Sequence, residues 1–158
     1  MSSFRTLRLT SMLSLVLISV VFAGMPNPKS EGSIELISLT PEAGSTVDRQ
    51  STIVAQLRFT IDNFKDKKDR YRISINFQDR NTRAATFSKG PGGMITLDQA
   101  SGTVTLEYPL DHIWDDPKLR KPLRLYFYLH ERTGKNETVV LDMTDAIEFS
   151  IRDEGPPA

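Results

Sequence analysis

The chain has 158 residues, with 20 basic and 20 acidic side chains, two histidines and no cysteine. A formal net charge of zero argues against nucleic-acid-binding and membrane-surface proteins, which are attracted to their partners by a basic excess. The lack of cysteine excludes a disulfide framework and an anchor through a lipidated cysteine. The fold must therefore be stabilised by its own hydrophobic core.

Residues 1–23 have the three parts of an export signal. Arg5 and Arg8 form a positive start, an apolar run follows over residues 12–23, and Val21 and Ala23 are small residues where a signal peptidase cleaves. We therefore predict cleavage after Ala23. A transmembrane anchor is disfavoured because the run has about a dozen residues, whereas a spanning helix needs about 20.

Removal of the signal leaves 18 basic and 20 acidic residues, a net charge of −2. Neither nucleic acid nor insertion into a membrane is expected of the mature chain. An exported domain without cysteine favours a bacterial envelope or secreted protein over an animal extracellular one, so we expect a periplasmic or extracellular location. Asn136 begins a glycosylation acceptor motif, which matters only in a eukaryotic secretory route.

The mature chain is predicted to contain one domain. Residues 24–32, "GMPNPKSEG", have the composition of a flexible spacer, and residues 153–158 that of a disordered tail. The domain over residues 33–152 contains no internal repeat and no convincing helical period.

Alternation of apolar and polar residues is the dominant pattern of this domain and predicts strands with one buried face. The strong runs are 51–61, 70–78, 102–108, 122–131 and 146–152, and weaker ones are 34–39, 84–88, 94–97 and 138–141. In the run 70–78, the alternation predicts that Ser74, Asn76 and Gln78 face outward.

Turn sequences separate these runs, among them "PEAGS" after the first strand and "GPGG" at 90–93. The turn "DQASG", 98–102, predicts a hairpin between the strands on either side of it. About seven to nine short strands with frequent turns predict an antiparallel β-sandwich or a barrel.

The opening "IELISLTPEAGSTVDRQSTIVAQLRFTI" resembles the start of bacterial immunoglobulin-like domains, and "PLRLYFYLHE" resembles a central strand of such a sandwich. The resemblance implies an all-β, antiparallel immunoglobulin-like or fibronectin III-like sandwich. It departs from antibody domains because there is no cysteine pair and because Trp114 does not lie on the third strand. It implies no activity, since this fold carries many functions.

The stretch "DHIWDD", residues 111–116, looks most like a site. Prolines before and after it predict a crossover loop in which Ile113 and Trp114 close one end of the core. One imidazole and three nearby aspartates match neither a zinc nor a calcium pattern. A hydrolase or metal-dependent protein that uses His112, Asp115 and Asp116 is thus the weakest of our functional hypotheses.

Other chemistry has little support in the sequence. In "DNFKDKKDR", 62–70, a calcium site at Asp62, Asp66 and Asp69 is opposed by three lysines in the same loop. The sequence lacks G-x-S-x-G, H-E-x-x-H and phosphate-loop motifs. We therefore expect no enzyme activity, no cofactor and no metal site.

The best functional hypothesis is an outward sheet face. If the strand 122–131 pairs with the strand 70–78, one face gathers basic and aromatic side chains: Arg70, Arg72, Arg124, Tyr126, Tyr128 and His130. Such residues carry binding energy at protein interfaces and stack on sugars. They also pair across strands on faces that merely contact water. We expect a binding or accessory domain for another envelope or extracellular protein, with a carbohydrate-binding module as the alternative.

Overall fold

The computed structural model describes residues 31–82, 85–135 and 137–152. The predicted signal, nearly all of the spacer and the predicted tail lie outside these residues. The described chain is all-β and forms two sheets, with one short 3₁₀ turn, η1 (Leu110–His112), as its helical element. No helix in the described part of the chain is long and apolar enough to cross a membrane.

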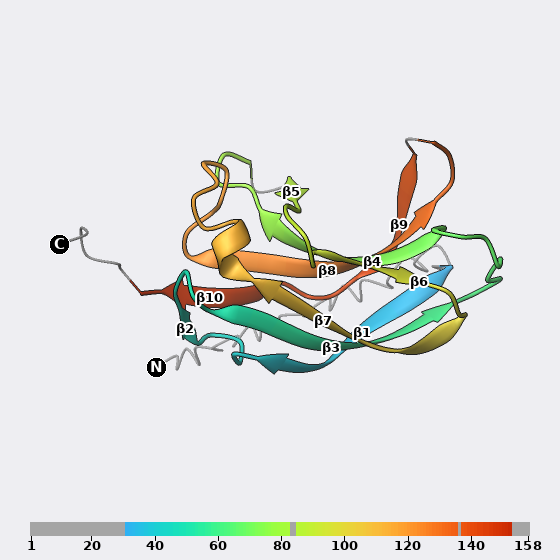
Figure 1. Ribbon diagram of the computed structural model, residues 1–158, viewed down its shortest axis with the longest axis horizontal. Helices are drawn as coiled ribbons and strands as arrows, with labels where there is room; N and C mark the ends of the chain where they lie inside the picture. The colour runs from blue at the N-terminus through green and yellow to red at the C-terminus, as the bar shows by residue number, and fades with distance from the viewer. Residues whose placement is uncertain (1–30, 83–84, 136, 153–158) are drawn as a thin grey trace, which may run out of the picture.

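The smaller sheet is antiparallel and has the order β1-β3-β7. Its strands are β1 (Gly32–Thr40), β3 (Thr52–Ile61) and β7 (Ser101–Pro109). In Figure 1 these strands run across the lower part of the molecule, below β8, β4 and β6.

The larger sheet has β8 and β4 at its centre. Along one edge of β8 lie β9 and then β10, and β2 pairs with β10 in parallel; along the far edge of β4 lie β6 and β5. The strands are β2 (Thr46–Val47), β4 (Tyr71–Gln78), β5 (Thr86–Phe87), β6 (Met94–Leu97), β8 (Leu123–Arg132), β9 (Thr138–Met143) and β10 (Ile147–Ile151).

The hydrophobic core lies between the sheets and confirms the predicted inward residues. Every apolar side chain predicted to face inward from 51–61, 70–78 and 122–131 is buried. The largest fully buried side chains come from both sheets: Phe59, Tyr108, Phe77, Phe127 and Phe149. The structure is thus a β-sandwich-like arrangement with one shared core.

Each predicted strand has a counterpart in the structure, and two details differ from the predictions. The two-residue strand β2 was not predicted, because two residues are too short to show a period. The predicted hairpin at 98–102 is wrong. Strand β6 pairs with β4 and β7 pairs with β3, so this turn carries the chain from one sheet to the other.

Candidate functional site

The predicted pairing of the strands 122–131 and 70–78 is confirmed. Strands β8 and β4 are antiparallel neighbours, with Arg72 opposite His130, Ser74 opposite Tyr128 and Asn76 opposite Tyr126. Directly opposite residues point to the same face of a sheet. These side chains therefore share the side of the larger sheet that faces away from the core, called here the β4–β8 face.

The side chains of β8 on this face form a contiguous row. The guanidinium of Arg124 lies 5.8 Å from the Tyr126 ring centroid, the two tyrosine rings are 6.1 Å apart, and the Tyr128 and His130 rings are 5.6 Å apart, edge to face. All four residues are half-buried. Contacts of this kind along a strand restrict the rotamers of the side chains, so the row presents an ordered surface.

Three of the predicted outward side chains of β4 are buried, whereas Arg72 is half-buried. Ser74, Asn76 and Gln78 are only 2%, 8% and 1% exposed. Longer polar side chains contact two of them: Nε2 of His130 lies 2.6 Å from Oγ of Ser74, and Arg120 donates to Gln78. The prediction of solvent-facing residues is therefore wrong in burial, although it is right in the face assigned.

His130 is held neutral by its surroundings. Burial lowers the pKa of its imidazole below the usual 6.5, and the positive charge of Arg72 lowers it further. Oγ of Ser74 also accepts a hydrogen bond of 2.7 Å from Nδ2 of Asn76. The centre of the β4–β8 face is thus a neutral, hydrogen-bonded network.

The three predicted arginines have different surroundings. Arg70 pairs with the buried Glu131 at the end of β8, and its guanidinium lies 5.8 Å from the Tyr71 ring. Arg124 lies 3.4 Å from the carboxylate of Glu148. Arg72 contacts the sulfur of Met94 at 3.5 Å, and no carboxylate of the described residues lies within ion-pair distance of it. Of the three predicted arginines, Arg72 is therefore the one without a carboxylate partner among the described residues.

Sequence reasoning missed the apolar part of the β4–β8 face. Met94 lies opposite Ser74 on one side and Met143 lies opposite Tyr128 on the other, so the residues form one row across the sheet. The two methionines are 50% and 53% exposed, and Val140, opposite His130, is similarly exposed. The alternation of "MITL" could have placed Met94 on a face, but the pairing of β9 with β8 required the tertiary structure.

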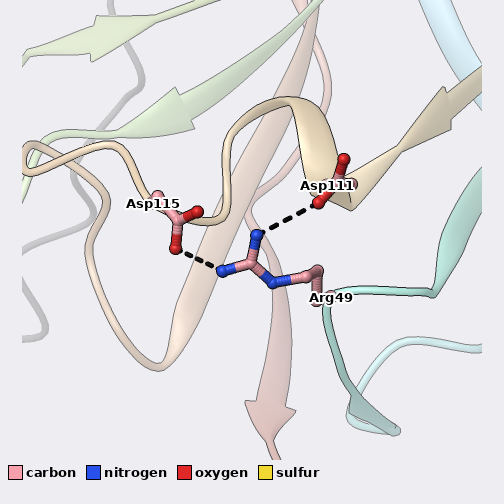
Figure 2. A network of polar contacts seen from close by, with 3 residues as sticks. All are labelled: Arg49, Asp111 and Asp115. Carbon is pink, nitrogen blue, oxygen red and sulfur yellow. Dashed lines mark hydrogen bonds and ion pairs between the residues drawn. The ribbon is translucent and has the colours of Figure 1, made fainter.

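The loop 111–116 has the predicted structural role. Ile113 and Trp114 are buried, and η1 precedes them. The guanidinium of Arg49 lies between Asp111 and Asp115, donates to both, and links this loop to the turn before β3 (Figure 2). The charge of Arg49 neutralises the two carboxylates and lowers the pKa of Asp115.

The three residues of the hydrolase or metal hypothesis, His112, Asp115 and Asp116, each contact a different partner. The ring of His112 contacts that of Tyr108, Asp115 pairs with Arg49, and Asp116 binds the backbone N–H of Lys118 and pairs with Lys89. Among the described residues, no group of three or more acidic or histidine side chains is arranged to hold a metal ion. A pocket of about 550 Å³ adjoins the loop, but both of its carboxylates, on Asp115 and Asp116, are paired with cations.

The loop 62–70, where a calcium site was considered, also contains no group of side chains arranged to hold a metal ion among the described residues. Phe64, at its start, is half-buried and its ring lies 5.2 Å from that of Tyr71. This contact attaches the loop to the core, which is a structural role.

No protein-family model matches the sequence, and no curated protein matches it. The function is therefore argued from the geometry of the β4–β8 face.

Proposed function

We propose that the protein is an exported, non-enzymatic binding domain with an immunoglobulin-like sandwich. It binds another envelope or extracellular protein through the β4–β8 face. The export signal and the near-neutral mature charge support the location and argue against nucleic acid or membrane as the partner.

The distribution of strands supports the immunoglobulin-like part of the proposal. The first, third and seventh strands form one sheet, while the fourth, eighth and tenth form the other, with the short β2 beside β10. Immunoglobulin-type sandwiches divide their strands in a similar way, with strands A, B and E in one sheet and C, F and G in the other. Within the described residues no strand covers the free edge of β7, where strand D of such domains lies.

The observation that carries the binding function is the row formed by Met94, Tyr128 and Met143. It places two half-exposed methionines beside an ordered tyrosine, with arginines around them. Methionine, tyrosine and arginine are enriched at protein interfaces, whereas lysine and glutamate are depleted. Methionine also adapts its shape to a partner at little cost, because its side chain is unbranched.

The test is capture of a partner by crosslinking in the native host. The face variant carries Met94→Thr and Met143→Thr, which remove exposed apolar surface and keep side chains that suit a strand. The control variant carries Gln56→Ala, Arg58→Ala and Thr105→Ala, all exposed on the smaller sheet. Circular dichroism and thermal unfolding verify that both variants fold.

We expect one partner to be captured by the wild type and the control variant and lost with the face variant. Equal capture by all three would contradict the proposal. If saccharides quench the intrinsic fluorescence and no protein is captured, the carbohydrate-binding alternative is favoured, with the rings of Tyr126 and Tyr128 as its platform.

A further inference from the structure

We infer that the partner contacts the β4–β8 face with an acidic side chain set among apolar ones, and that its carboxylate pairs with Arg72. This inference rests on the proposed binding function and adds the chemistry of the partner. It follows from the charges on the face, from the environment of Arg72 and from the apolar row beside it.

Arg72 lacks the anion that its guanidinium requires. Its Nε is buried and has no hydrogen-bond partner in the described part of the chain, and its Nη1 has the weak acceptor Sδ of Met94. Nε of Arg124 also has no hydrogen-bond partner in the described part of the chain, but Arg58 and Arg124 differ from Arg72 because carboxylates of Glu35 and Glu148 lie within 4 Å of them. A half-buried guanidinium without an acceptor is unfavourable, and a carboxylate supplies acceptors in the geometry that guanidinium binds best.

The neighbours of Arg72 supply no negative charge. Thr96 on β6 and His130 on β8 lie directly opposite it, and Ser74 follows it on the same face. Thr96 and Ser74 are uncharged, and His130 is neutral above its lowered pKa. The local charge is therefore positive, and an approaching carboxylate meets no repulsion.

The same charge argues against a second copy of this chain as the partner. Two copies related by a twofold axis that passes close to Arg72 would bring their Arg72 side chains together. Glu148, the carboxylate paired with an arginine of this face in the described part of the chain, already lies beside Arg124. A partner that brings its own carboxylate satisfies the charge, whereas a second β4–β8 face does not.

Exposed apolar side chains near Arg72 would surround the carboxylate of a partner. Met94 contacts Arg72 directly. His130 lies opposite Arg72, and Val140 lies opposite His130 on the other side, so Val140 is two strands away from Arg72. Met94 and Val140 are both about half exposed. Apolar side chains of a partner that cover them would exclude water around the guanidinium, and an ion pair is stronger where water is excluded.

The experiment selects a displayed library of random nonapeptides on the immobilised full chain, in parallel with three variants. Arg72→Gln removes the charge, Arg58→Gln removes a matched exposed charge on the smaller sheet, and Met94→Thr with Met143→Thr removes the apolar row. We expect the wild type and Arg58→Gln to enrich peptides in which Asp or Glu is flanked by apolar residues. The other two variants should lose them.

A synthetic peptide from the enriched set then measures the ion pair. Replacement of its Asp or Glu by Asn or Gln should weaken binding to the wild type at least tenfold and leave binding to Arg72→Gln unchanged. Arg72→Lys, which keeps the charge but loses the paired hydrogen bonds, should bind several-fold more weakly than the wild type. If Arg72→Gln does not fold, Arg72→Lys is used in its place, and replacement of the peptide's Asp or Glu should then weaken binding less than it does with the wild type.

Each other outcome has a defined meaning. Enriched peptides that lack acidic residues, or that bind Arg72→Gln as well as the wild type, overturn the inference. If those peptides are still lost with the methionine variant, the proposed binding function stands. Peptides that bind all variants equally, or no enrichment on the wild type, count against both.

Discussion

The two sheets have outer faces of different character. On the smaller sheet, most outward side chains are polar and reach water: Ser33, Glu35, Thr52, Gln56, Arg58, Thr60, Thr103, Thr105 and Glu107. The half-buried Val54 and the exposed Ile37 are apolar exceptions. On the larger sheet, the outward side chains of β4 from Ser74 to Gln78 are buried, and half-buried aromatic residues and exposed methionines surround them.

The difference arises from the neighbouring strands. β3 and β4 are both central strands with alternating sequences, and both bury their inner faces. Beside β3, the residues opposite Gln56 are the short Ser38 of β1 and Thr105 of β7, so Gln56 stays exposed. Beside β4, the tyrosines of β8 are long, so Asn76 is covered. Burial on an outer face thus depends on the lengths of cross-strand partners.

The largest expected effect on the free energy of unfolding comes from the core that the two sheets share. Phe127→Ala should lower the free energy of unfolding by about 3–5 kcal/mol, because it removes a fully buried ring and leaves a cavity. Thr60→Ala, on the exposed face of the smaller sheet, should change it by less than about 0.5 kcal/mol. Denaturant unfolding measures both, and equal losses would contradict the assignment of inner and outer faces.

The next effect distinguishes the two outer faces directly. Ser74→Ala should lower the free energy of unfolding by about 1–3 kcal/mol, because it removes the hydroxyl oxygen that His130 and Asn76 both contact. The matched control Thr105→Ala, which is exposed, should be nearly neutral. If the two variants unfold at the same denaturant concentration as the wild type, the network on the β4–β8 face contributes nothing to stability.

A smaller effect should appear with pH. The pKa of His130 is lowered in the folded state and is near 6.5 in the unfolded state. Well above pH 6.5 the imidazole is neutral in both states and the full stability is present. As the pH falls below 6.5 the unfolded state binds a proton first, so stability decreases until the pH reaches the folded pKa. His130→Gln should flatten this part of the stability curve. A wild-type curve that is already flat there would refute a buried neutral imidazole.

The smallest expected effect on stability comes from the loop 111–116, which belongs to neither sheet face. Arg49→Ala should raise the pKa of Asp115, because the guanidinium that donates to this carboxylate lowers its pKa in the wild type. Carboxyl chemical shifts followed by NMR through a pH titration measure the change. Arg58→Ala serves as the control and should leave the titration of Asp115 unaltered. Unfolding should change little, since exposed ion pairs contribute little to stability.

The candidate site was only partly predictable. Alternation assigned Tyr126, Tyr128 and His130 to one side of their strand and Arg72 to one side of its own. That these sides form one face was expected from the pairing that the resemblance implies, and the structure shows this pairing. The sequence could not identify Met94 and Met143 as their neighbours. These residues come from other strands, and the pairing of strands is not encoded in the period of either one.

The sequence by itself determined which segments are strands and which side chains face the core, because both follow from local alternation of polar and apolar residues. The tertiary structure decided which sheet each strand joins, as the segment after 98–102 demonstrates by crossing to the smaller sheet. It also decided which outward residues are covered, and that no carboxylate of the described residues pairs with Arg72. These properties depend on contacts between segments far apart in the chain, and the alternation of a single strand contains no information about them.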